Sequence, residues 1–384
     1  MRICILGGDG YLGWPTSLYF AQRGHDILII DNGIKRHWER QCGVGPLVPL
    51  PKLGERLNIW RRLSGQAISL EECDISVEYK RLAFELKEFK PDAIVHYAEQ
   101  PSAPFSMIDR ERAIETQRNN IVGTLNVIYA MKEVCPQAHL IKLGTMGEYG
   151  TPNIAIEEGW LNITHEGRTD RVLFPKRPGS VYHLSKVHDT ANLEFACRIW
   201  GMRVTDLNQG VVYGVGTHET LLGAGLHTSF HYDAVFGTVL NRFVTQAVAG
   251  VPITVYGNGT QTRGFINILD TVRCIEIAAS NRPEAGEFRV FNQVTAHHSV
   301  NDLAEMVQRQ ANLCGLPATI RHLQNPRIEA ENHYYSPKYT ALQNLGLKPH
   351  ELDGSVISEM IEVVKENRLR IEIGQITPKI SWHS

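Results

Sequence analysis

The sequence contains no closely spaced pair of cysteines. Its seven cysteines are scattered along 384 residues, no Cys-x-x-Cys occurs, and their number is odd. This distribution excludes a disulfide scaffold and a cysteine-rich zinc site, and it is typical of reduced thiols in a cytosol-like compartment. The sixteen histidines show no metal-ligand spacing either, so we expect no bound metal.

Long apolar runs and an excess of one charge are also missing. No run approaches the roughly 18 apolar residues that span a bilayer, and no basic segment precedes a cleavable apolar stretch at the N-terminus. Lys and Arg number 39 against 41 Asp and Glu, a net charge of -2, whereas nucleic-acid binding needs a clustered cationic excess. We therefore expect a cytoplasmic protein that neither inserts into membranes nor binds nucleic acid.

Short apolar runs alternate with longer helical patterns over the first two thirds of the chain. Runs that do not alternate in polarity, separated by helices, indicate a parallel sheet covered on both faces. The expected class is therefore α/β, with a Rossmann-like doubly wound parallel sheet. Strands are expected at 2–8, 25–32, 67–75, 92–100, 138–145 and 202–214, with prominent helices at 111–134 and 182–200.

Two segments depart from this rhythm. Residues 32–65 carry prolines and basic residues, and we interpret them as an insertion over one edge of the sheet. Its basic residues are either functional or simply a solvated face. After residue 214 the pattern becomes mixed, which predicts a smaller C-terminal mixed α/β lobe. We therefore divide the chain into residues 1–214 and 215–384, with segments of the second part returning to the first.

A glycine-rich turn follows the first strand and opens the first helix. Gly7, Gly10 and Gly13 have the spacing G-x-x-G-x-x-G, with Tyr11 and Leu12 inside it. Such glycines make a tight turn, let the backbone approach a pyrophosphate and let the helix pack on the strand. The N-terminus of the helix attracts phosphate. The turn therefore predicts a dinucleotide site.

Acidic residues end the second and third strands. Asp31 stands where a carboxylate accepts hydrogen bonds from an adenosine ribose and repels a 2′-phosphate, which favours NAD over NADP. Lys35 and Arg36 lie nearby and weaken that preference. Asp74 and Ile75 close the third strand, where they either contact adenine or cap the next helix.

Tyr182 and Lys186 are spaced i and i+4 and therefore share one face of a helix. A lysine ammonium beside a phenol lowers the pKa of the phenol, so Tyr182 is a candidate base for a substrate hydroxyl. Thr145 ends the fifth strand, at the sheet edge where doubly wound folds bind ligands. Together with the glycine turn, the three residues indicate a catalytic site.

Longer motifs run over the whole chain. They are GGDGYLGW (7–14), EQPSAPFSMIDR (99–110), KLGTMGEYGTPN (142–153), YHLSKVHD (182–189), TDLNQGVVYG (205–214), YDAVFGTVLNRF (232–243), TVYGNGTQTRGF (254–265), GEFRVFNQ (286–293) and NPRIEAENHYY (325–335). On these motifs the chain resembles the extended short-chain dehydrogenase/reductase superfamily, in its sugar-nucleotide epimerase and dehydratase branch. More closely, it is similar to the UDP-sulfoquinovose synthase family.

The resemblance implies a reaction of UDP-glucose with sulfite that uses a tightly held NAD. Tyr182 would take the proton of the C4 hydroxyl while hydride goes to NAD. The 4-ketone then acidifies the C5 hydrogen, and loss of water across C5 and C6 gives a 4-keto-5-ene. Sulfite adds at C6, and the hydride returns to C4, which gives UDP-sulfoquinovose. The further cofactor contacts that it implies are Asn32, Tyr97, Asn119, Lys186, Gln209 and Val212.

The loop after Thr145 departs from the related 4,6-dehydratases. Those enzymes carry Asp-Glu at the two positions that are Met146 and Gly147 here, which argues against an ordinary 4,6-dehydratase. We hypothesise that His183 and Glu148 move the C5 proton and assist water loss. The alternatives are that His183 packs against the sheet and that Glu148 only holds the loop.

Substrate contacts are expected mainly from the C-terminal lobe. Arg263 and Arg327 are the candidates for the UDP diphosphate or ribose, because a guanidinium binds such oxygens bidentately. Pro101 stands where chloroplast members carry Arg, which bears on sulfite affinity. The remaining family positions around the nucleotide sugar are Gln100, Ser102, Thr145, Gln209, Asn241, Arg242, Thr254, Tyr256, Gln261 and Glu329.

Two other functions remain open from the sequence. One is a UDP-sugar 4-epimerase or dehydratase of the same fold, which would consume UDP-glucose without sulfite. The other is a redox-sensing binding protein, but such sensors usually lose the Tyr/Lys pair that is present here. The resemblance also implies a homodimer and leaves room for a sulfite-delivering partner protein.

Overall fold

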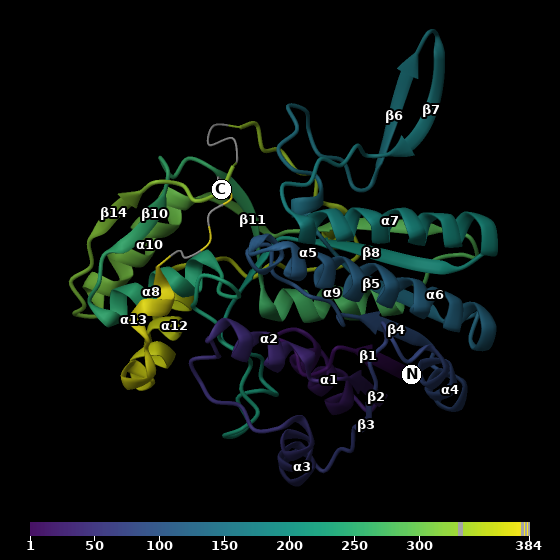
Figure 1. The fold of residues 1–384 in the computed structure, drawn as a ribbon, viewed down its shortest axis with the longest axis horizontal. Helices are drawn as coiled ribbons and strands as arrows, with labels where there is room; N and C mark the ends of the chain where they lie inside the picture. Colours follow the sequence, from purple (N-terminus) through teal and green to yellow (C-terminus); the bar gives the residue numbers. More distant parts are fainter. Residues whose placement is uncertain (329–332, 378–379, 381, 383–384) are drawn as a thin grey trace.

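The computed structural model describes residues 1–328, 333–377, 380 and 382. At its centre is a seven-stranded sheet in which every neighbouring pair is parallel, in the order β12-β8-β5-β4-β1-β2-β3 (Figure 1). The expected α/β class with a doubly wound sheet is confirmed. The strands are β1 (Arg2–Leu6), β2 (Asp26–Asp31), β3 (Ser69–Glu72), β4 (Ala93–His96), β5 (His139–Thr145), β8 (Arg203–Gln209) and β12 (Phe288–Gln293).

Helices cover both faces of this sheet, and the sequence of β1 shows why. Ile3 and Ile5 pack into one buried cluster with α1 and α9, whereas Cys4 and Leu6 pack into another with α4, α6 and α7. The order in which the chain adds strands to the sheet reverses between β1 and β4, and such a switch point opens a ligand crevice at the carboxyl ends of the strands. The covering helices are α1 (Gly13–Gln22), α4 (Tyr79–Phe89), α5 (Arg110–Gln117), α6 (Gly123–Val134), α7 (Val181–Trp200) and α9 (Ile268–Ser280).

Three sequence expectations need correction. The helix expected at 111–134 is interrupted by a π-helical turn, η2 (Arg118–Val122). The third strand spans four residues rather than 67–75. The strand expected at 202–214 divides into β8 and β9 (Val211–Tyr213) at Gly210, where an added Cβ would lie 2.7 Å from the carbonyl oxygen of Gly264.

The insertion after β2 forms α2 (Ile34–Cys42) and α3 (Leu53–Ser64), and α3 lies by the β3 edge of the sheet (Figure 1). Its basic residues are not simply a solvated face. Arg56 is fully buried, stacks over Trp14, and pairs with Asp9 at 2.9 Å. Arg36 pairs with the other oxygen of Asp9 at 2.5 Å. The insertion is therefore fastened to the glycine turn.

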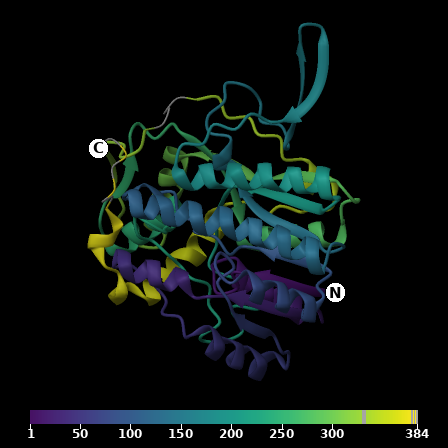
Figure 2. The same ribbon diagram turned by 45° about the vertical axis from the view of Figure 1, so that its right-hand side comes forward.

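A second lobe surrounds its own buried cluster (Figures 1 and 2). It pairs β10 with β14 and adds a sheet in the order β13-β11-β9. Between these segments the chain returns to the central sheet through α9, β12 and α11 (Ala341–Asn344). The lobe contains α8 (Val239–Ala249), β10 (Ile253–Tyr256), β11 (Thr262–Asn267), β13 (Ala296–Ser299), α10 (Val300–Leu313), β14 (Ile320–Leu323), α12 (Gly354–Glu366), η4 (Arg368–Arg370) and α13 (Ile373–Ile376).

The hairpin of β6 (Trp160–His165) and β7 (Arg168–Leu173) projects from the body of the molecule (Figures 1 and 2). It arises from the segment that follows η3 (Met146–Glu148), and a further short helix, η1 (Phe105–Met107), follows β4. Of the helices in the described residues, none combines the length and the apolarity needed to cross a membrane.

Candidate active site

A cavity of about 960 Å³ lies at the carboxyl ends of the central strands and extends into the second lobe. It runs from the glycine turn past the end of β5 and the start of α7 to residues of α8 and β11. Its size is at the upper end of the range for small-molecule and cofactor pockets. One cavity can therefore hold a dinucleotide and a second ligand end to end.

The glycine turn has the shape that a pyrophosphate needs. Gly7 has φ 85°, and a Cβ there would lie 2.7 Å from the amide nitrogen of Ala98. A Cβ on Gly13 would lie 2.0 Å from the carbonyl oxygen of Gly7. Neighbouring backbone atoms occupy the space that side chains at Gly7 and Gly13 would need. The turn at the N-terminus of α1 therefore fits a dinucleotide phosphate.

Asp31 lines the cavity at the end of β2. Its carboxylate accepts hydrogen bonds from the amides of Asp9 (2.9 Å) and Gly33 (2.7 Å). Lys35 donates to Glu39 at 2.6 Å, and Arg36 pairs with Asp9. Because carboxylates already engage both cations, neither is a ready partner for a 2′-phosphate.

Most of the other expected cofactor contacts line the cavity, but Arg36 does not. Asp74 lines it, so its contact with adenine stays a prediction. The same side chain accepts hydrogen bonds from the amide and hydroxyl of Ser76 and does not cap α4, whose N-cap residue is Glu78. The cavity is also lined by Gly7, Gly10, Tyr11, Leu12, Gly13, Asn32, Lys35, Ile75, Tyr97, Asn119, Gln209 and Val212.

Thr145 and Tyr182 line the cavity near its middle. Thr145 ends β5, where its hydroxyl accepts a hydrogen bond from the amide of Gly147 at 3.2 Å. Ser180 caps the N-terminus of α7, and the amide of Tyr182 donates to the hydroxyl of Ser106 at 3.0 Å. These backbone contacts fix where the two hydroxyl-bearing side chains enter the cavity.

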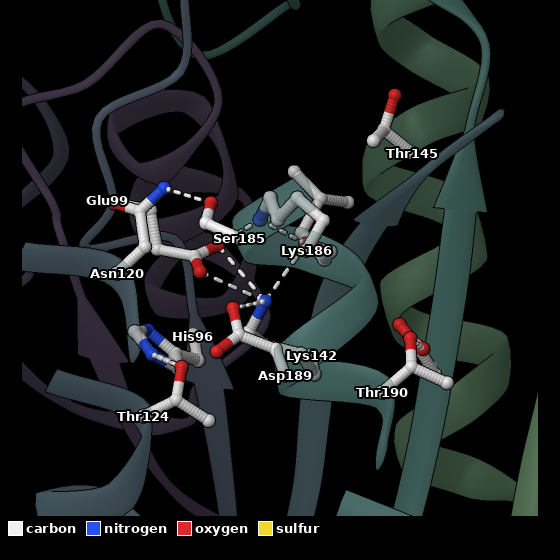
Figure 3. Close-up of polar contacts among 12 residues, drawn as sticks. His96, Glu99, Asn120, Thr124, Lys142, Thr145, Ser185, Lys186, Asp189 and Thr190 are labelled. Carbon is white, nitrogen blue, oxygen red and sulfur yellow. Dashed lines mark hydrogen bonds and ion pairs between the residues drawn. The ribbon is translucent and has the colours of Figure 1, made fainter. Parts of the chain in front are cut away.

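Lys186 lies one helical turn below Tyr182 and does not line the cavity. Its ammonium is 5.9 Å from the centre of the Tyr182 ring. It contacts the carboxylate of Glu99 and donates to the carbonyl of Leu143 at 2.5 Å (Figure 3). The Lys186 ammonium is therefore already paired with a carboxylate and hydrogen-bonded to a backbone carbonyl.

The expected lowering of the Tyr182 pKa needs correction. Burial raises the pKa of Tyr182, and this effect outweighs the cation that lowers it, which is Lys142. Burial also lowers the pKa of Lys186 to about 8. Lys186 is thus not by itself the source of an acidic phenol.

His183 forms part of the cavity wall. Its Nδ1 lies 2.9 Å from the hydroxyl of Ser180. A Cβ on Gly147 would lie 2.2 Å from its Nε2, so the imidazole fills the space of a side chain at that position. Burial, with Arg327 and Arg263 nearby, lowers the pKa of His183 to about 3. The ring is therefore neutral near pH 7.

Glu148 does not line the cavity. It is fully buried, accepts hydrogen bonds from the amide of Thr145 (3.0 Å) and the hydroxyl of Thr190 (3.0 Å), and contacts the ammonium of Lys176. The hypothesis of direct proton transfer by Glu148 is corrected accordingly. Its geometry fits the alternative, in which it holds the loop that carries Thr145.

Most of the expected substrate contacts meet at the far end of the cavity. Among the described residues, the buried oxygens Asn241 Oδ1 and Gln261 Oε1 have no hydrogen-bond partner, which leaves acceptors for a ligand. Arg242 donates to the hydroxyl of Tyr256 at 2.9 Å. The expected substrate contacts that line the cavity anywhere along its length are Ser102, Thr145, Gln209, Asn241, Arg242, Tyr256, Gln261, Arg263 and Arg327.

Three expected contacts are not among them. Gln100 donates through its backbone amide to Asn120 at 2.8 Å, and Thr254 exchanges hydrogen bonds with Gln246 at 2.7 and 2.9 Å. Neither Gln100 nor Thr254 lines the cavity, so each supports a wall rather than facing the ligand. Glu329 lies outside the described residues.

Several cavity residues escaped the sequence analysis. Trp38 and Phe236 line the cavity from α2 and from the loop before α8, and Arg177 lines it from the loop before α7. Glu99 also lines it, held from below by Lys142. Glu99 and Lys142 lie inside two of the family motifs, but no spacing along the chain indicates that they meet.

Comparison with known proteins gives the class of this site. The chain belongs to the NAD dependent epimerase/dehydratase family, whose model matches residues 3–292. The glycine cradle fits this assignment, and NAD is the cofactor of the family.

Two relatives place the chain, within that family, among the UDP-sulfoquinovose synthases. It is 50% identical over 381 residues to the chloroplastic UDP-sulfoquinovose synthase of Spinacia oleracea, which covers 99% of this chain and 79% of that protein. It is 42% identical over 385 residues to the UDP-sulfoquinovose synthase of Sulfolobus acidocaldarius, covering 100% of this chain and 98% of that protein. The resemblance inferred from the motifs is confirmed.

A solved structure shares the fold. The UDP-glucuronic acid 4-epimerase from Bacillus cereus, in complex with UDP-glucuronic acid and NAD, superposes with a TM-score of 0.70 at 20% identity. The match covers 95% of this chain and 99% of that one.

Proposed function

We propose that this chain is a UDP-sulfoquinovose synthase that converts UDP-glucose and sulfite to UDP-sulfoquinovose. Its two full-length relatives carry that name. The observation that carries the chemistry is the wall of the cavity, which Thr145, Tyr182 and His183 all line, with His183 lying against Gly147. The glycine turn lies in the same cavity.

The chemistry begins at C4 of the sugar. NAD, when bound, supplies a reversible hydride acceptor for C4. Tyr182 takes the proton of the C4 hydroxyl, and Thr145, whose oxygen already accepts from the amide of Gly147, donates a hydrogen bond to the C4 oxygen. Lys186 supports Tyr182 from below.

The resulting C4 carbonyl acidifies the C5 hydrogen. His183 takes this proton as a neutral imidazole, the C6–O bond breaks, and the departing hydroxide takes up a proton to leave as water. Sulfite then forms a C–S bond at C6 while C5 regains a proton. Return of the hydride to C4, with return of the proton from Tyr182 to the C4 oxygen, would restore the C4 hydroxyl. The net change is UDP-glucose plus bisulfite to UDP-sulfoquinovose plus water.

The UDP part of the substrate fits the second lobe. Arg263 and Arg327 provide cationic groups for the diphosphate, and the unpartnered oxygens of Asn241 and Gln261 accept from the ribose or the base. We accordingly propose that residues 1–214 hold NAD and residues 215–384 hold most of the nucleotide sugar, with α9 and β12 completing the first part.

The oligomeric state, the compartment and a sulfite-delivering partner are further parts of this proposal. Exposed apolar side chains of α5 and α7, among them Ile114, Leu184 and Ile199, favour a homodimer through these helices. All seven cysteines are unpaired, which favours a reducing compartment such as the cytoplasm. A sulfite-delivering protein remains part of the proposal.

The test is mass spectrometry of the products from purified protein with UDP-glucose, sulfite and NAD. The proposal predicts a product in which sulfonate replaces one hydroxyl, formed only when sulfite is present. Formation of UDP-galactose or a dehydrated sugar, without sulfur incorporation, would instead favour a 4-epimerase or a dehydratase.

A further inference from the structure

Four charged side chains, those of Glu99, Lys142, Lys186 and Asp189, lie together in the interior (Figure 3). Glu99 follows β4, Lys142 lies on β5, and Lys186 and Asp189 lie on neighbouring turns of α7. Their side chains are only 1–4% exposed. Charges this deeply buried are stable only while they are paired, because removal from water costs several kcal/mol for each ion.

The four groups form a chain of alternating charge. The carboxylate of Glu99 bridges the two ammonium groups, at 2.9 Å from Lys142 and in direct contact with Lys186. Lys142 is also 3.1 Å from Asp189. Among the described residues, Asp189 makes no well-directed hydrogen bond through its carboxylate oxygens, so the ion pair with Lys142 is its main interaction.

This pairing changes what Lys186 can do for Tyr182. Glu99 neutralises Lys186, so the i, i+4 lysine does not present an unbalanced positive charge to the phenol. Asp189 adds a second negative charge on the same helix. Without Lys142, the cluster would have a net charge of -1 and would oppose a phenolate at Tyr182.

We propose that Glu99 and Lys142 are positioning residues for the base: Glu99 fixes the Lys186 ammonium, and Lys142 cancels the carboxylates so that Tyr182 can ionise. The proposal rests on the proposed function, because it takes Tyr182 as the base. It explains why a second lysine is buried where the Tyr/Lys pair alone would require none.

The other ionisable groups around the cluster are consistent with this role. Lys142 lowers the pKa of Tyr182 against burial, while Glu148 and Asp189 raise it. His96 and His183 are neutral, because burial holds their pKa values low.

Two further carboxylates, Glu148 and Asp206, lie near the cluster. Burial lowers the pKa of Lys186, whereas Asp189 and Asp206 raise it. Glu148 is paired with Lys176, and Asp206 accepts from Thr190 at 2.9 Å. Within the described structure, Lys142 is therefore the group whose removal changes the charge next to Tyr182 most directly.

The experiment measures kcat for UDP-sulfoquinovose formation against pH in Lys142→Met, Asp189→Asn and the double variant. In Lys142→Met, the acid limb of the profile is expected to move to higher pH by about one unit. The rate at pH 7 then falls about tenfold and recovers as the pH rises. Asp189→Asn is expected to move the limb to lower pH. The double variant, with a neutral cluster again, is expected to return toward the wild type.

A purely structural role predicts a different pattern. Losses would then add in the double variant, and the acid limb would stay in place in all three proteins; that result overturns the proposal. If Lys142→Met does not fold, Asp189→Asn alone still decides, since an unmoved limb in the folded protein also overturns it.

Two controls complete the design. Thr205→Val removes the hydroxyl that lies 2.9 Å from His139, another buried polar pair between β5 and β8 that does not line the cavity. It is expected to reduce stability without moving the pH profile. Wild-type protein that turns over UDP-glucose without making a sulfonated product contradicts the proposed function instead, so the two failures are distinguishable.

Discussion

At the scale of single residues, the relation of His183 to Gly147 distinguishes this site. The loop after Thr145 carries no acidic side chain at Met146 and Gly147, and the neutral imidazole of His183 takes up the space beside Gly147. We therefore propose that the base for the C5 proton enters the cavity from α7 rather than from the loop.

We expect His183→Ala to lower UDP-sulfoquinovose formation by about 10²- to 10⁴-fold, the range that a general base contributes. UDP-glucose binding should change less, because the substitution leaves Arg263 and Arg327 in place. Product analysis by mass spectrometry measures the loss. His188→Ala, an exposed histidine on the same helix, is the control and should keep full activity. Full activity of His183→Ala would refute the role of this residue.

Gly13 offers a residue-scale test of the cofactor cradle. A Cβ at Gly13 would overlap the carbonyl oxygen of Gly7, so Gly13→Ala should distort the turn and lower the NAD content of the purified protein. The amount of NAD released on denaturation measures this. Gly54→Ala in α3, where a Cβ meets nothing within 4 Å, should retain NAD; equal retention by both variants speaks against the cradle.

At the scale of elements, the N-cap residue of α7, Ser180, also contacts the side chain of His183. The hydroxyl of Ser180 accepts from the amide of His183 at 3.1 Å and lies 2.9 Å from its Nδ1. The Ser180 side chain thus caps the N-terminus of α7 and also contacts the imidazole of His183.

Ser180→Ala should therefore destabilise the protein by about 1 kcal/mol, as the loss of an N-cap does, and also reduce activity. Asp353→Ala removes the cap of α12, which is far from the cavity lining, and should reduce stability alone. Thermal unfolding and product formation, measured on both variants, separate the two effects. Unchanged activity of a folded Ser180→Ala protein would show that the cap does not orient His183.

Local sequence patterns predicted where strands and helices lie, but not where they are interrupted. The glycine turn, Asp31, Thr145 and Tyr182 could be placed because each follows a strand or begins a helix with a local signature. The π turn at η2 and the division of β8 from β9 at Gly210 depend on close packing between segments, which no local pattern encodes. The same holds for Lys142, whose partners Glu99 and Asp189 come from different elements.

At the scale of the whole molecule, buried histidines tie stability to pH. Burial lowers the pKa of His139 to about 3, and His183 behaves alike. The unfolded chain binds protons at these rings below about pH 6.5, whereas the folded chain does not. Stability present above pH 6.5 is therefore lost as the pH falls toward 3.

We expect the free energy of unfolding to fall by about 1 kcal/mol per pH unit below pH 6.5 for each such ring. His139→Gln should flatten this dependence, and the exposed His165→Gln should not. Urea unfolding between pH 7 and 5 measures the slopes. Parallel slopes for wild type and His139→Gln would mean that His139 is already protonated in the folded protein.

The central claim is that one cavity carries both sugar oxidation and carbon–sulfur bond formation. The most direct measurement is mass spectrometry of wild-type protein with UDP-glucose, NAD and ³⁴S-labelled sulfite. The account predicts a UDP-hexose product that carries ³⁴S, absent without sulfite and absent in His183→Ala. Turnover of UDP-glucose to products without ³⁴S would contradict it.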